Sequence, residues 1–139
     1  MGVGLSVFLS VIGASIGISI SAPAIAGAGT ERPEIVSKSL IATILAEAIA
    51  IYGLVVGLLS IFRVTGGLTD VDLGFRIFAG GAIMGIAAIA AGIGIGTSGS
   101  ALASATAEKP ELFSRAVVPL ILAEALAIYA FVAALLLVI

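Results

Sequence analysis

Residues 44–53 of the chain read ILAEAIAIYG, and residues 121–130 read ILAEALAIYA. Each stretch places one glutamate, Glu47 or Glu124, inside a long apolar run. The likeness extends beyond these stretches, because sliding the chain by 77 residues without a gap matches 23 of 49 positions over residues 13–61. Self-similarity at a fixed spacing is typical of a repeated structural unit. The sequence therefore predicts a tandem duplication with one such glutamate in each copy.

The composition indicates an integral membrane protein. Of the 139 residues, 61% are hydrophobic and only 10% are charged, and the mean hydropathy is +1.36. A soluble domain of this size has too little polar surface to cover so many apolar side chains. The chain contains no cysteine and no histidine, so we expect no metal centre and no cofactor. The net charge of −2 and the scattered basic residues argue against a nucleic-acid partner.

Four apolar runs predict four transmembrane helices. Each run is longer than the roughly 20 residues that an α-helix needs to cross the hydrocarbon layer. Strands are the weaker interpretation, because a membrane barrel needs shorter, alternating segments and more of them. We expect an all-α fold of two tandem αα-hairpins, over residues 1–62 and 73–139, with a linker over residues 63–72. The runs occupy residues 3–28, 35–62, 73–105 and 112–139.

The first run is predicted to be a spanning helix of the mature protein. It begins at Met1 without the basic residues that precede the hydrophobic region of a secretory signal, and it is longer than such a region. A cleaved signal is the alternative, because residues 21–24 are rich in small side chains.

Two short polar breaks have the same form. Residues 29–34 contain Glu-Arg-Pro-Glu, and residues 106–111 contain Glu-Lys-Pro-Glu. Proline near the first position of a helix, followed by an acidic residue, is a helix-start signal, so each break is predicted to be a tight turn. Positive charge is more frequent around these turns than around the middle break, which predicts cytoplasmic turns and both termini on the far side. The residues compared are Arg32, Lys38, Lys109 and Arg115 against Arg63 and Arg76.

Glu47 and Glu124 are the two acidic residues that lie within spans. Each is fourteen residues past the proline of its turn, about 20 Å along the helix and near the middle of the membrane. An ionised carboxylate at this depth costs at least a few kcal/mol, so we expect each to rest in its neutral form. The nearest basic residues before them, Lys38 and Arg115, are nine residues away, so a counter-charge must come from another protein. An inert polar staple between helices is the alternative.

A tyrosine follows each glutamate by five residues, Tyr52 in the first copy and Tyr129 in the second. Five residues turn a helix by roughly 140°, so we expect no hydrogen bond within one helix. A bond to the glutamate of an adjacent hairpin and simple interface packing are both open. Pro119 lies five residues before the second glutamate, whereas Ala42 holds the matching place in the first copy. The two sites are therefore expected to differ in local geometry.

The first and third runs carry glycines at four- and seven-residue spacings. Small residues at these spacings line one helix face and let neighbouring backbones approach closely. We expect these helices to form the inner layer of an assembly, with the glutamate helices outside; ordinary packing inside a four-helix monomer is the alternative. A Gly-x-Gly-x-x-Gly pattern at residues 94–99 is not assigned to a nucleotide, because that motif needs a preceding strand. The glycines are Gly13, Gly17, Gly81, Gly85, Gly92 and Gly96.

A duplicated hairpin, a glycine-striped first helix, a turn of the form E-[RK]-P-E and a glutamate in ILAEA-[IL]-A-I-Y together resemble the proteolipid of vacuolar-type and archaeal-type rotary ATPases. The resemblance covers nearly the whole chain. It implies a membrane ring of copies that rotates against a stator protein, each carboxyl exchanging an ion beside a stator arginine. Glu47 and Glu124 occupy the ion-carrying position of the family. Many double-hairpin relatives keep one such acid, whereas this chain has two.

The resemblance also implies partners and a location. Residues 29–34 and 106–111 match the cytoplasmic loops that contact the central stalk, in a machine that makes or consumes ATP. The membrane is the cell membrane if the source is archaeal, and otherwise a vacuolar or other organellar membrane. A structural or pore-forming proteolipid without ion transport is the rival class, and a free-standing proton-coupled transporter is a second rival.

The resemblance favours protons over sodium. Sodium needs several oxygen ligands, and sodium-carrying relatives supply Thr and Gln just after the acid and Gln on the facing helix. The matching places hold Ala48, Ile49, Ala125 and Leu126, with Ile18 and Ile95 on the facing helices. Four hydroxyls on the facing helices keep sodium open as the alternative: Ser19, Ser21, Thr97 and Ser98.

Overall fold

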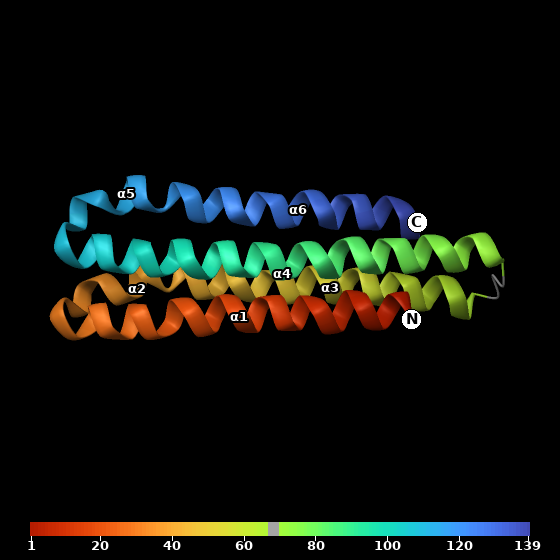
Figure 1. Cartoon of the computed structure of the whole chain (residues 1–139), viewed down its shortest axis with the longest axis horizontal. Helices are drawn as coiled ribbons and strands as arrows, with labels where there is room; N and C mark the ends of the chain where they lie inside the picture. The colour runs from red at the N-terminus through yellow and green to blue at the C-terminus, as the bar shows by residue number, and fades with distance from the viewer. Residues whose placement is uncertain (67–69) are drawn as a thin grey trace.

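The computed structural model describes residues 1–66 and 70–139, which form a bundle of four long helical rods (Figure 1). Residues 67–69 of the predicted linker lie outside the described residues. Four helical segments are long and apolar enough to cross a membrane. The predicted all-α fold of four transmembrane helices is therefore confirmed. The elements are α1 (Gly2–Glu31), η1 (Pro33–Ile35), α2 (Val36–Ser39), α3 (Ile41–Thr65), α4 (Val71–Glu108), η2 (Pro110–Leu112), α5 (Phe113–Ala116) and α6 (Val118–Val138).

The chain reverses direction at two single residues, Arg32 and Lys109. Helix α1 continues up to Glu31, and the amide of Arg32 still donates to the carbonyl of Ala28 at 3.0 Å. Proline at the next position disfavours the helical conformation of the residue before it, and Arg32 and Lys109 accordingly adopt φ −137° and −138°. The predicted six-residue turns are thus shorter than expected. Both turns lie at one end of the bundle, and the two termini point toward the other end (Figure 1).

Both glutamate-bearing rods are interrupted at the same place in the repeat. The interruption is Leu40 between α2 and α3 and Val117 between α5 and α6, positions that are 77 residues apart. Pro119 lies in the first turn of α6, where its missing N–H leaves no helical hydrogen bond unmade. Since Ala42 follows the same break in the first copy, the interruption itself does not depend on Pro119.

Helices α1 and α4 share the most extensive interface of the bundle. A Cβ atom added at Gly85 would lie 2.7 Å from the carbonyl oxygen of Leu5, and one added at Gly92 would collide with the backbone of Gly13. Only glycine permits this backbone approach. The predicted close packing of the glycine-striped helices is therefore confirmed. Helix α3 packs against both α1 and α4, whereas α6 packs against α4 and one flank of α3.

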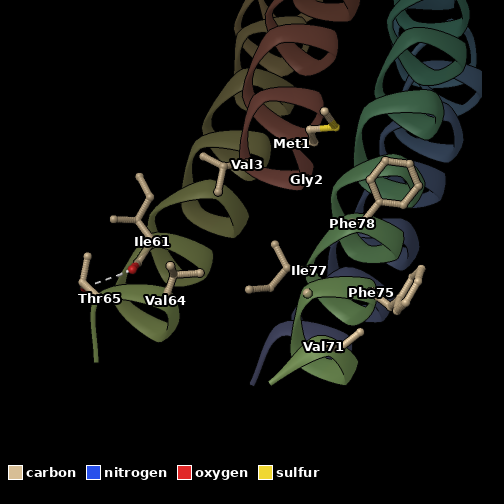
Figure 2. Close-up of a pocket in the computed structure, with 11 residues that line it drawn as sticks. Met1, Gly2, Val3, Ile61, Val64, Thr65, Val71, Phe75, Ile77 and Phe78 are labelled. Carbon is tan, nitrogen blue, oxygen red and sulfur yellow. Dashed lines mark hydrogen bonds between the residues drawn. The ribbon is translucent and has the colours of Figure 1, made fainter. Parts of the chain in front are cut away.

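An open apolar hollow of about 730 Å³ lies beside the start of α1, between α3 and α4 (Figure 2). At this end of the bundle α3 and α4 extend past the start of α1 (Figure 1). Its lining includes Val3, Ile61, Val64 and Phe78. The α3 residues that line it, from Ile61 onward, are more than ten residues from Glu47. The hollow therefore contributes nothing to the glutamate sites.

Candidate functional site

The structure buries Glu124 between α6 and α3. Its side chain is only 7% exposed. The hydroxyl of Tyr52 on α3 donates a hydrogen bond of 2.5 Å to Oε1 of Glu124. Oε2 is buried and has no hydrogen-bond partner among residues 1–66 and 70–139. Of the two open predictions for Tyr52, the bond to a glutamate of the adjacent hairpin is confirmed.

Phe131 holds the Tyr52 ring in place. The two rings are stacked with centroids 5.1 Å apart and an interplanar angle of 27°. Phe131 follows Glu124 by seven residues, so both side chains lie on the same face of α6. Helix α6 therefore presents two groups to Tyr52: the Glu124 carboxyl, which accepts a hydrogen bond from its hydroxyl, and the Phe131 ring, which packs on its ring. This aromatic contact was missed from the sequence, where the seven-residue spacing was its only signal.

Glu47 has a different environment. It is exposed on α3, on the flank away from the one that carries Tyr52, since five residues separate them by roughly 140°. Tyr129 on α6 is likewise 68% exposed. The structure thus brings one predicted site residue, Glu124, into a hydrogen-bonded interface and leaves the other on the outer surface of the chain.

The backbone behind each glutamate is nevertheless the same. A Cβ atom at Gly17 of α1 would lie 2.9 Å from Cβ of Ala46, and one at Gly94 of α4 would lie 3.2 Å from Cβ of Ala123. Ala46 and Ala123 directly precede the two glutamates, so each hairpin supports its glutamate with the same close helix contact. The difference between the sites arises on the other side of each outer helix.

The hydroxyls near the sites bond to their own helices. Ser19 donates to the carbonyl of Ile16 at 2.9 Å and Ser21 to that of Gly17 at 2.8 Å. Thr97 donates to that of Ile93 at 2.9 Å. Across the described ranges 1–66 and 70–139, no three acidic side chains cluster as metal ligands would. A carboxyl with one phenol as its partner can take up and release a proton.

Comparison with known proteins agrees with the duplication. The profile of the C-subunit family of ATP synthases matches the chain twice, over residues 1–60 and 78–137, and the two matches begin 77 residues apart. The chain is 38% identical to a 16 kDa proteolipid of the V-type proton ATPase from Caenorhabditis elegans (the c-type proteolipid numbered 2), covering 99% of this chain and 86% of the relative.

Two further relatives give the same result. The c-type 16 kDa proteolipid of the V-type proton ATPase from Rattus norvegicus is 38% identical, with 99% of this chain and 88% of the relative covered. That of Ascaris suum is 39% identical, with 99% and 86% covered. The chain therefore belongs to the C-subunit family of ATP synthases and, within it, to the double-hairpin proteolipids of V-type ATPases.

Proposed function

We propose that copies of this protein form the rotor ring of a rotary ATPase, and that Glu47 and Glu124 carry protons past a stator arginine. Rotation of the ring couples this transfer to ATP hydrolysis or synthesis. The observation that supports the proposal best is the bond between Tyr52 and Glu124, because it joins two hairpins at a carboxyl buried in the middle of the spans. An intramembrane carboxyl with a defined partner is typical of a proton pathway.

The surroundings of each glutamate suit a carrier that meets a stator at the outside of a ring. Apolar side chains one turn before the glutamates are exposed on the outer helices: Ile44 is 62% exposed and Ile121 is 49% exposed. Each carboxyl thus lies beside a surface suited to lipid, from which an arginine of another protein can approach. An arginine there would supply the counter-charge that neither glutamate has closer than nine residues along the chain.

Protons are the proposed ion. The residues that directly follow the glutamates carry no side-chain oxygen, being Ala48, Ile49, Ala125 and Leu126, and Ile95 on the facing helix is fully buried. A proton needs only the carboxyl, whereas sodium needs several oxygen ligands in place of its water. The names of the three relatives also specify proton ATPases.

The division into two hairpins, over residues 1–62 and 73–139, and the sidedness of the chain are part of the same proposal. We assign the turns at residues 29–34 and 106–111 to the cytoplasmic side, where they would contact the central stalk. The excess of basic residues near the turns supports this orientation. The protein is an integral membrane protein, with four helices able to span the bilayer.

Carbodiimide labelling tests the proposal. The reagent attacks protonated carboxyls in apolar surroundings, and mass spectrometry of labelled membranes identifies the modified residue. We expect labelling at Glu47 and Glu124 that persists to near-neutral pH and does not change with sodium. Glu34 and Glu111, exposed in η1 and η2 just after the turns, serve as internal controls and should stay unlabelled.

Other labelling results would favour the rivals. Protection of the glutamates from labelling by sodium would support the rotor ring but indicate that it carries sodium and not protons. Absence of label at both glutamates would indicate buried staples in a structural or pore-forming proteolipid. Co-purification of the ring with soluble ATPase subunits separates the rotor from both a pore and a free-standing transporter.

A further inference from the structure

The exposed Glu47 lacks the cover that its counterpart has inside the chain. Ionisable groups within membrane spans almost always face protein or a water-filled cavity. Glu124 obeys this rule because α3 of the preceding hairpin covers it. Glu47 is exposed on α3, so none of the helices formed by residues 1–66 and 70–139 covers it as α3 covers Glu124.

The uncovered flank extends along α1 in the same way. Ile95 of α4 is fully buried in the core that also contains Ile49 of α3. Its counterpart in the first copy, Ile18 of α1, is 37% exposed. Val11 is exposed as well, whereas its counterpart Ala88 is fully buried. The surface by which the second hairpin contacts the first hairpin therefore has an equivalent on the first hairpin, and there it is exposed.

The opposite flank of the chain supplies a matching surface. Tyr52 and Tyr129 are equivalent in the repeat, and Tyr129 lies exposed on the flank of α6 that faces away from α3. A second copy placed as the second hairpin is placed on the first would bring its Glu47 flank against this Tyr129 flank. Such a contact joins two different surfaces, so repetition generates a ring when the rotation closes.

We propose that the hydroxyl of Tyr129 completes the Glu47 site of the next copy, and that this site between chains is looser than the Tyr52–Glu124 site within a chain. The proposal rests on the ring described under Proposed function and identifies its interface. It is the continuation of an interface already formed inside the chain, with a phenol on one flank and a carboxyl on the other.

The looser site follows from one difference between the repeats. Tyr52 is stacked on Phe131, but the residue equivalent to Phe131 in the first copy is Leu54, which is 46% exposed. Tyr129 of one chain would therefore meet Leu54 of the next chain and lose the aromatic stack. A stacked aromatic pair favours the packed arrangement by a factor of roughly two to ten in population, beyond the effect of the area it buries. Two kinds of site would thus alternate around the ring: Glu124 with the tightly packed Tyr52, and Glu47 with the more loosely packed Tyr129.

Cysteine cross-linking in membranes tests the interface, since the native chain contains no cysteine. The variant Glu47→Cys/Tyr129→Cys, treated with a short bifunctional thiol reagent, should give a ladder of covalent multimers on a denaturing gel. The matched variant Tyr52→Cys/Glu124→Cys joins equivalent positions inside one chain and should migrate as a monomer. Each single-cysteine variant should give no cross-link.

Two cross-linking results would overturn the interface. One is a monomer from Glu47→Cys/Tyr129→Cys under conditions where the matched variant reacts completely. The other is a dimer from either single-cysteine variant, which indicates a two-fold contact between identical surfaces.

Carbodiimide labelling with both glutamates intact tests the hydrogen bond and the looser packing. Tyr129→Phe should speed labelling of Glu47 and leave Glu124 unchanged, because the hydroxyl no longer occupies the carboxyl oxygen. Leu54→Phe should slow labelling of Glu47 by roughly two- to tenfold, and Phe131→Leu should speed that of Glu124 by a similar factor. Equal effects of Tyr129→Phe on both glutamates, or none on either, would overturn the proposal.

These measurements report geometry and do not depend on ion transport. A ladder from the cross-linked variant together with normal proton transport in Glu47→Gln would overturn the carrier role of Glu47 and leave the interface standing. Loss of transport in Glu47→Gln, with no ladder from the cross-linked variant, would overturn the interface and leave the carrier role of Glu47 standing.

Discussion

The hydroxyl of Tyr52 and the carboxyl of Glu124 form a hydrogen bond of 2.5 Å between residues 72 positions apart in the sequence. It joins the outer helix of one hairpin to the outer helix of the other. In an apolar environment such a bond has no water to replace it, so it fixes the rotation of α3 and α6 about their axes relative to each other.

Replacing Tyr52 by Phe should remove this bond and little else, because the ring can still stack on Phe131. We expect the free energy of unfolding in detergent to fall by about 1 kcal/mol, and carbodiimide labelling of Glu124 to become faster. Tyr129→Phe is the matched control and should leave the labelling of Glu124 unchanged. If Glu124 reacted at the same rate in Tyr52→Phe and the native protein, the hydroxyl would have no role in controlling access to the carboxyl.

The contact between α1 and α4 should not tolerate even one methyl group at Gly92. A Cβ atom there would collide with the backbone of Gly13, so Gly92→Ala should lower the free energy of unfolding by about 1–3 kcal/mol. Gly74 lies in the same helix with no atom of the described residues within 4 Å of an added Cβ, and Gly74→Ala should be neutral or slightly stabilising. Thermal unfolding in detergent compares the two. Equal melting temperatures for both variants would show that the helices separate easily at Gly92.

The hydroxyl of Ser6 should stabilise the first hairpin specifically. It donates a buried bond of 2.8 Å from α1 to the carbonyl of Gly53 on α3, and the repeat places Ile83 and Ala130 at these positions in the second hairpin. Ser6→Ala should cost about 0.6–1.7 kcal/mol. Ser60→Ala is the control, because Ser60 donates to Val56 within its own helix. Identical losses in the two variants would argue against a bond that holds α1 to α3.

Pro119→Ala should change the start of α6 very little. The first copy has Ala42 at the matching position and keeps the same break at Leu40 that the second copy has at Val117. Helical content by circular dichroism and the labelling rate of Glu124 should both stay within error of the native protein. A clear rise in helical content would mean that proline, and not the repeated backbone, interrupts this rod.

The sequence was sufficient to predict the helices and the turns, because the signals for them are local. Apolar run length determined the spans, and Pro33 and Pro110 located the turns. The turns proved shorter than predicted, since helical hydrogen bonds continue to the last residue before each proline. Nothing in the pattern of polar residues shows where such bonding stops.

The environment of the two glutamates was beyond local prediction. Glu47 and Glu124 have nearly the same neighbours in sequence, so any local signal gives them the same environment. They differ because one hairpin follows another along the chain and is covered by it. The partner of Tyr52 likewise depends on how α3 and α6 are rotated relative to each other, which is a property of their packing.

Replacing either glutamate by glutamine should stop proton transport, because an amide cannot release a proton beside an arginine. Every copy in the ring would carry the blocked site, so rotation would stall whichever glutamate is replaced. In membranes with the whole ATPase, ATP-driven acidification should fall roughly tenfold or more in Glu47→Gln and in Glu124→Gln. The variant Glu34→Gln, at an exposed position of η1, should keep its activity. Normal transport in Glu47→Gln, with loss in Glu124→Gln, would leave Glu124 as the sole carrier and halve the number of protons moved per chain in each revolution.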